Sequence, residues 1–117
     1  MATTLFRLAA ILCFLAVGLG AFGAHALKAT LQESGMLDVW NKAVLYHLVH
    51  AVALIALALP GAGNRAAYYL IVAGILFFSG SLYVMALTNV RWLGAITPIG
   101  GLCFLAGWAW LVISPKL

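Results

Sequence analysis

The side chains with the widest range of chemistry in this chain are its three histidines, His25, His47 and His50. Imidazole is the commonest transition-metal ligand in proteins, and it also ligates haem iron. His25 and His50 are therefore candidate ligands of a haem or a transition metal. The two acidic residues, Glu33 and Asp38, form no His-Glu-x-x-His pattern with them. A simpler interpretation stays open, in which each ring hydrogen-bonds a facing helix and fixes its position.

Other polar side chains recur at helical spacing around these histidines. Lys42, Tyr46 and His50 are four residues apart, so they lie on one face of a helix. Ser79 and Tyr83 repeat this spacing further along the chain. Because polar groups are costly in lipid unless they face other helices, we predict that they line one polar pocket in one half of the membrane. The predicted ligand-binding residues are His25, Tyr46, His50, Ser79, Ser81, Tyr83 and Thr97.

Catalytic chemistry has little support in these residues. Ser79 and Ser81 lie inside an apolar run rather than at a turn between a strand and a helix. No Asp or Glu occurs in any apolar run, so neither a catalytic triad nor a pair of carboxylates is available there. We therefore predict a non-enzymatic protein without catalytic residues, and the sequence assigns no cofactor.

The elements that position these residues follow from composition. Of the 117 residues 67% are hydrophobic and 7% are charged, whereas soluble proteins carry about a quarter of charged residues. A helix needs about 20 residues to cross the hydrocarbon core of a membrane. Four apolar runs of roughly this length, without the alternation typical of membrane strands, cover residues 5–27, 40–59, 66–87 and 92–113. The sequence thus predicts one all-α domain, an antiparallel four-helix transmembrane bundle.

The connections between the runs are short, which makes successive helices antiparallel and places both termini on one side of the membrane. Gly35 is predicted to end a helix and Asp38 to cap the next one. The first run imitates a secretory signal, but its apolar part is longer than usual, so we expect a retained helix. Lys and Arg are divided equally between the two sides, and the amino-terminal end tips the prediction towards cytoplasmic termini.

Small and aromatic residues add two further expectations. Tryptophan and tyrosine favour the headgroup layers, so Trp40 and Trp92 are expected at one membrane surface and Tyr68 near the other. Glycine lets membrane helices approach closely, and such faces also suit a homo-oligomer. The predicted helix-packing residues are Gly20, Gly23, Gly80, Gly100 and Gly107.

Three segments, GAFGAHAL at 20–27, FSGSLY at 78–83 and TPIGGLCFLAGW at 97–108, resemble the signatures of the YgdD-like small integral membrane proteins. This family is catalogued as domain of unknown function 423 and has small eukaryotic transmembrane relatives. The resemblance spans the chain and implies a four-helix protein of a bacterial inner membrane or a mitochondrion, with no established substrate. The matching motif residues are Gly20, Phe22, Gly23, His25, Tyr46, His50, Ser79, Gly80, Ser81, Tyr83, Thr97, Pro98, Gly100, Gly101, Gly107 and Trp108.

Three functional hypotheses follow. The preferred one is a multi-pass membrane protein whose polar pocket holds a small ligand, a lipid headgroup or a partner helix. The second is a redox protein with haem or metal on His25 and His50, and the third is a structural subunit of a membrane complex. The expected partners are membrane lipids and a homo-oligomer or a partner membrane protein. Basic residues are scattered over every loop, so no continuous patch for nucleic acid exists.

Overall fold

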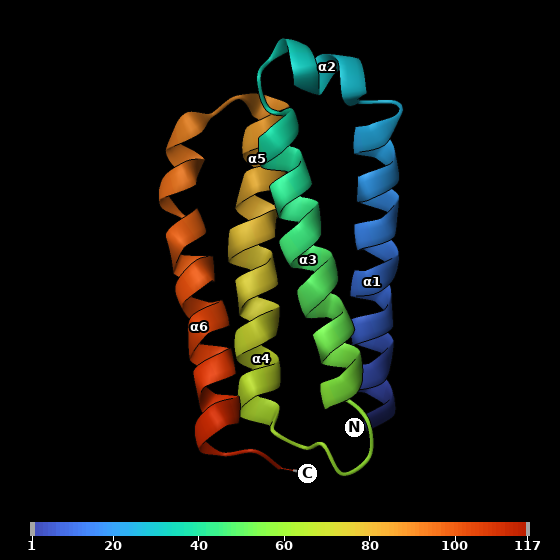
Figure 1. Cartoon of the computed structure of the whole chain (residues 1–117), viewed down its shortest axis with the longest axis vertical. Coiled ribbons are helices and arrows are strands. Elements are labelled where there is room, and N and C mark those ends of the chain that lie inside the picture. The colour runs from blue at the N-terminus through green and yellow to red at the C-terminus, as the bar shows by residue number, and fades with distance from the viewer. Residues whose placement is uncertain (1, 117) are drawn as a thin grey trace.

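The computed structural model describes residues 2–116, and these residues form an all-α antiparallel four-helix bundle, as predicted (Figure 1). Four helical stretches are long and apolar enough to cross a membrane, and both ends of the chain lie at the same end of the bundle. The elements are α1 (Ala2–Ala24), α2 (Lys28–Glu33), α3 (Leu37–Leu57), α4 (Arg65–Gly74), the π-helix η1 (Ile75–Ser79), α5 (Gly80–Thr88), the 3₁₀-helix η2 (Arg91–Ala95) and α6 (Thr97–Ile113).

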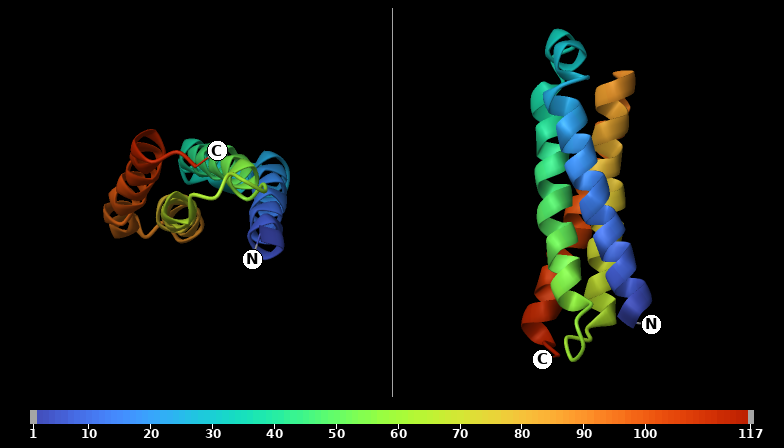
Figure 2. Two further views of the ribbon diagram at one scale, coloured as in Figure 1. Left: turned by 90° about the horizontal axis from the view of Figure 1, so that it is seen from below. Right: turned by 90° about the vertical axis from the view of Figure 1, so that its right-hand side faces the viewer.

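The spanning helices pack as two pairs that are joined in the middle. α1 packs along α3, and α6 packs along α4, while α3 also contacts α4, η1 and α5 (Figure 2). α1 and α6 are consequently the outer helices. The molecule measures 46 × 26 × 18 Å, so its long axis exceeds the hydrocarbon core of about 30 Å. We call the half nearest the termini the terminal half and the half nearest α2 the α2 half.

The first connection differs in detail from its prediction. Gly35, with φ of 74°, ends α2 as expected, and the Met36 N–H donates to the Leu31 carbonyl at 2.8 Å. Met36 and Leu31 are both buried, which fixes where the chain turns. α3 therefore starts directly after Met36, and Asp38 lies in its first turn rather than at its cap. The prediction that Asp38 caps this helix is wrong for that reason.

The second connection is a tight turn followed by a capped helix. The Ala62 N–H donates to the Leu59 carbonyl at 3.1 Å, with Pro60 and the positive-φ Gly61 between them, which is the pattern of a type II turn. The Asn64 side chain then accepts a hydrogen bond from the Ala67 N–H at the start of α4. Its amide also donates to the Ser114 carbonyl at 2.7 Å, which ties this loop to the end of α6.

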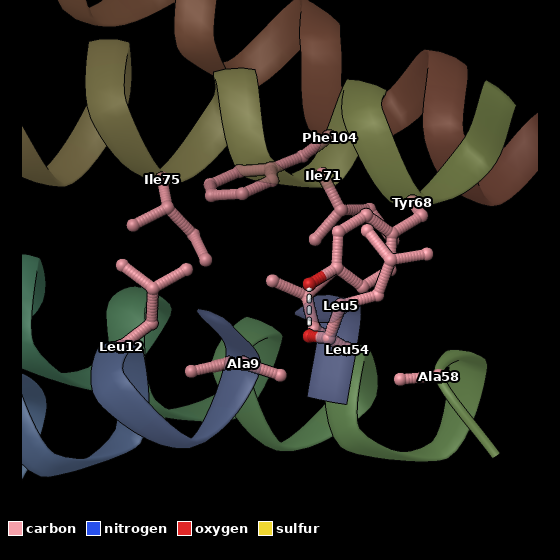
Figure 3. Close-up of a cluster of buried hydrophobic side chains, with 10 residues drawn as sticks. Leu5, Ala9, Leu12, Leu54, Ala58, Tyr68, Ile71, Ile75 and Phe104 are labelled. Carbon is pink, nitrogen blue, oxygen red and sulfur yellow. Dashed lines mark hydrogen bonds between the residues drawn. The ribbon is translucent and has the colours of Figure 1, made fainter. Parts of the chain in front are cut away.

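Apolar side chains pack in a separate cluster in each half. The cluster of the terminal half, drawn in Figure 3, brings together residues of α1, α3, α4, η1 and α6. Within it the Tyr68 ring is buried and its hydroxyl donates to the Leu5 carbonyl at 2.6 Å. Trp40 is buried in the other cluster and donates to the Leu19 carbonyl at 2.9 Å. A backbone carbonyl of α1 thus satisfies the polar tip of each ring inside the protein.

Glycine lies at the closest approaches between helices. A side chain at Gly23 would collide with the Trp40 indole, and one at Gly100 would collide with the Phe78 backbone. Gly80 instead has no neighbour within 4 Å of an added Cβ, so it serves no such contact. Gly80 follows the π-helix η1, whose wider turn changes the directions in which the next residues point. Regular α-helical spacing therefore does not predict which face Gly80 occupies. The glycines with close neighbours on a facing helix are Gly20, Gly23, Gly74, Gly100 and Gly107.

Candidate functional site

Buried hydroxyl groups tie the third spanning helix to its neighbours on both sides. Ser79, which ends η1 and is fully buried, donates to the Ala43 carbonyl of α3 at 2.7 Å. The Ser81 and Thr97 hydroxyls, from α5 and α6, are 2.7 Å apart. Serine and threonine commonly serve as interhelical hydrogen-bond donors in membranes. These three predicted ligand-binding residues are thus engaged in contacts between helices.

A further polar contact joins α3 to α5. His47 Nδ1 and the Tyr83 hydroxyl are 2.8 Å apart, and the Tyr83 ring also meets Trp40 edge to face with centroids 4.9 Å apart. His47 is buried, and its Nε2 makes no hydrogen bond within residues 2–116. Tyr83, predicted as a ligand-binding residue, is therefore paired with the one histidine that the sequence argument did not include in the pocket.

His50 forms a polar contact that joins α3 to α6. Its Nδ1 is 2.8 Å from the Tyr46 carbonyl, and Trp108 Nε1 donates to its Nε2 at 3.0 Å. A carbonyl only accepts and an indole N–H only donates, so His50 is the neutral imidazole with its proton on Nδ1. The ring also stacks on Phe104 with centroids 3.7 Å apart. Both ring nitrogens of His50 are consequently engaged inside the protein.

His25 lies apart from the other predicted residues. It is exposed next to the end of α1, where it lines a shallow hollow with Gly18, Ala21 and Phe22. Gly23, two residues earlier, faces Trp40 of α3. Two residues correspond to about 200° around a helix, so a helix that turns Gly23 inward turns His25 outward. The expectation that His25 converges with the other polar residues is corrected by this placement.

The residues present do not fit a haem or metal held by His25 and His50. His25 lies on the outer face of α1, whereas His50 lies at the contact of α3 with α6 and uses both nitrogens there. Within residues 2–116 no group of three or more His, Cys, Asp or Glu side chains is placed to hold a metal ion.

The accessible part of the site is a groove on the surface of α3. A hollow of about 490 Å³ is lined by Asp38, Asn41, Lys42, Leu45 and Tyr46. A second hollow, of about 180 Å³, shares Leu45 and Tyr46 and continues to Val49 and His50. We call the two together the α3 groove. Its outer end is polar and charged, and its inner end is mainly apolar.

Sequence reasoning found part of this groove. The spacing of Lys42, Tyr46 and His50 placed them on one helix face, and all three line the groove. Leu45 and Val49 were missed, although they follow from the same face at positions beside Tyr46. The Tyr46 ring packs on Phe78 with centroids 4.6 Å apart while 40% of the residue stays exposed. Tyr46 thus forms a wall between the protein interior and the groove.

Comparisons with known proteins identify a matching family model and similar membrane proteins. A family model described as "Protein of unknown function (DUF423)" matches residues 19–101. A UPF0382 membrane protein of Staphylococcus haemolyticus is 48% identical over 111 residues, which cover 92% of this chain and 90% of that protein. The UPF0382 membrane protein YwdK of Bacillus subtilis is 45% identical over 113 residues, covering 92% of this chain and 91% of that protein. No solved structure matches the chain.

Proposed function

This chain belongs to the DUF423 family of bacterial multi-pass integral membrane proteins of unknown function, and from that premise we propose that it is a non-enzymatic lipid-binding protein whose α3 groove holds a phospholipid. One observation carries the proposal: the groove changes from charged to apolar in the direction in which a lipid of the same leaflet changes from headgroup to chain. The ligand lies against the surface of α3 and undergoes no chemical conversion.

The outer end of the groove suits a phosphate-bearing headgroup. Lys42 supplies a cation, Asn41 supplies an amide donor, and Asp38 supplies a carboxylate for an amine. All three lie in the first two turns of α3, which begins at Leu37. Basic side chains at this depth contribute about 1 kcal/mol each to the binding of anionic headgroups.

The inner end suits the start of an acyl chain. Lys42 and His50 are separated by eight residues, or about 12 Å along the helix. Leu45 and Val49 are 60% and 51% exposed along this path, so they offer an apolar surface to a chain. The Tyr46 hydroxyl has no hydrogen-bond partner within residues 2–116 and could donate to a lipid ester carbonyl.

The bonds behind the groove hold its walls in place. Tyr46 packs on Phe78, and its carbonyl accepts from His50, which in turn accepts from Trp108 of α6. A surface that is fixed before binding loses less entropy when a ligand settles on it. The polar residues predicted as direct ligand contacts therefore act, in this proposal, mainly by positioning α3.

Native mass spectrometry with phospholipids in mild detergent tests the proposal. Replacing Leu45 with Trp fills the groove, and we expect it to weaken phospholipid binding about tenfold, equivalent to about 1.4 kcal/mol. Leu105→Trp is the matched control, because Leu105 is equally exposed on α6 but outside the groove. Lys42→Gln should weaken binding about fivefold, whereas Lys28→Gln, at the same end of the bundle, should not.

Two results would contradict the proposal. Equal lipid affinity of Leu45→Trp and Leu105→Trp would remove the groove as a lipid site. A Leu45→Trp protein that keeps its lipids but loses a second copy or a stable partner protein would show that the groove is an assembly surface. That outcome would favour the hypothesis of a structural subunit or homo-oligomer.

A further inference from the structure

We infer that the terminal half contains a second binding site, a cavity for a phosphate group whose cation is Arg65. The cavity has a volume of about 200 Å³ and lies between the α3–α4 connection and the first turns of α1, with Tyr68 among its lining residues. It is at the opposite end of the bundle from the α3 groove. The inference does not depend on the proposed function, because the two sites share no residue.

The walls of this cavity are fixed by hydrogen bonds that leave its interior open. Asn64 ties the connection to the Ser114 carbonyl, and Tyr68 ties α4 to the Leu5 carbonyl. The turn at Pro60 and Gly61 bends the chain away, and a Cβ added at Gly63 would meet no atom within 4 Å. Room for a ligand is therefore built into the connection and needs no rearrangement of the helices.

The charge of this end favours an anion. Arg65 lines the cavity, and Arg7 lines a neighbouring hollow that shares Ala58, Leu59 and Pro60 with it. The only acidic side chains of the chain, Glu33 and Asp38, lie at the α2 end. No carboxylate side chain is thus available at this end to neutralise either guanidinium. Guanidinium groups bind phosphate oxygens through a planar pair of N–H donors.

The position of the cavity identifies the chemistry of its ligand. The connection between two spanning helices lies at the membrane surface, at the depth of lipid phosphates. Asn64 already satisfies the Ala67 N–H, so the Arg65 guanidinium, rather than the end of α4, supplies the donors for an anion in the cavity. A phosphate group can reach this site either as the headgroup of an anionic phospholipid or as a free ion from the aqueous side.

Lipid competition on the full-length protein tests the inference. In native mass spectrometry we expect the protein to prefer phosphatidylglycerol over phosphatidylcholine with the same chains. Arg65→Gln should reduce that preference about fivefold, the effect of one basic side chain beside an anionic headgroup. Lys116→Gln removes the same charge at the same end but outside the lining of the cavity, so we expect a change of less than about twofold.

A second measurement identifies the source of the phosphate. Inorganic phosphate, added at constant ionic strength against chloride, should raise the thermal midpoint of the wild type but not of Arg65→Gln if the site takes a free ion. Lipid preference without this shift assigns the site to a headgroup. The inference is overturned if neither probe depends on Arg65, or if Lys116→Gln has the same effect as Arg65→Gln. Repeating the comparison with Leu45→Trp separates this site from the α3 groove.

Discussion

The terminal half and the α2 half hold the same four helices together by different means. In the terminal half, Leu54 and Ile71 are fully buried in an apolar cluster, and Tyr68 reaches a backbone carbonyl. In the α2 half, side chains bond directly across helices, as His47 does with Tyr83. Because lipid chains are as apolar as leucine, apolar packing in a membrane depends on close fit rather than on escape from water. Apolar packing therefore determines how closely the helices fit in the terminal half. In the α2 half, hydrogen bonds determine the position of one helix along another.

The largest expected loss of stability comes from a substitution in the apolar cluster of the terminal half. Leu54→Ala leaves a cavity in the packed cluster and should lower the free energy of unfolding by about 2 kcal/mol. Reversible unfolding in mixed detergent micelles measures this change. Leu102→Ala, at a residue 65% exposed on α6, is the control and should have almost no effect. A similar loss in both variants would mean that the apolar cluster is not the source of stability in this half.

The next effect compares a hydrogen bond between α3 and α6 with a thiol packed on the apolar cluster. His50→Leu removes the acceptor of the Trp108 N–H and should destabilise the protein by about 1 kcal/mol. Cys13→Ala, which changes a half-buried thiol on α1 packed against the apolar cluster, should cost less. Thermal melts of both variants with and without native lipid extract measure the difference. Equal tolerance of the two changes would contradict a special role of this hydrogen bond in holding α3 and α6 together.

The smallest expected effect comes from removing one hydrogen bond of the α2 half, between His47 and Tyr83. Tyr83→Phe removes the hydroxyl that meets His47 and should cost about 0.6 kcal/mol, the average for hydrogen bonds between membrane helices. A double-mutant cycle with His47→Phe separates this bond from the packing of the Tyr83 ring on Trp40. Strictly additive losses would show that the bond contributes nothing and that register is set by ring packing alone.

Composition and spacing were sufficient to predict the four spans and their antiparallel order. These features depend on the average properties of long segments, which the sequence displays directly. Asn64 lies in the short connection before the third run and caps α4 through its side chain. α1 and α3 each start three residues before the predicted runs, because helices can continue beyond the apolar core of a membrane. They also end earlier than the predicted runs, at residue 24 instead of 27 and at residue 57 instead of 59.

The orientation of individual side chains could not be predicted as well. His25 faces outward because Gly23 faces Trp40, and this choice between helix faces depends on a residue of another helix. The Trp108 indole N–H bonds to His50, a pairing that the sequence did not indicate. Such pairings depend on the relative rotation of α3 and α6, which periodicity within one helix does not determine. The cavity beside Arg65 likewise combines residues of α1 with residues of the α3–α4 connection, which come together only in three dimensions.

The π-helical turn η1 lets the third span carry one residue more than a regular helix would. A π turn contains about one residue more than an α turn, and it lies between Gly74, which accommodates Phe104, and Ser79, which bonds to Ala43. Deleting a single amino acid from 76–78 would let the segment relax to regular geometry and leave α4 and α5 in nearly their present relative rotation. Deleting one elsewhere in the third span would instead rotate the parts on either side by about 100°. A deletion within η1 should accordingly be tolerated better than a deletion in α4 or α5.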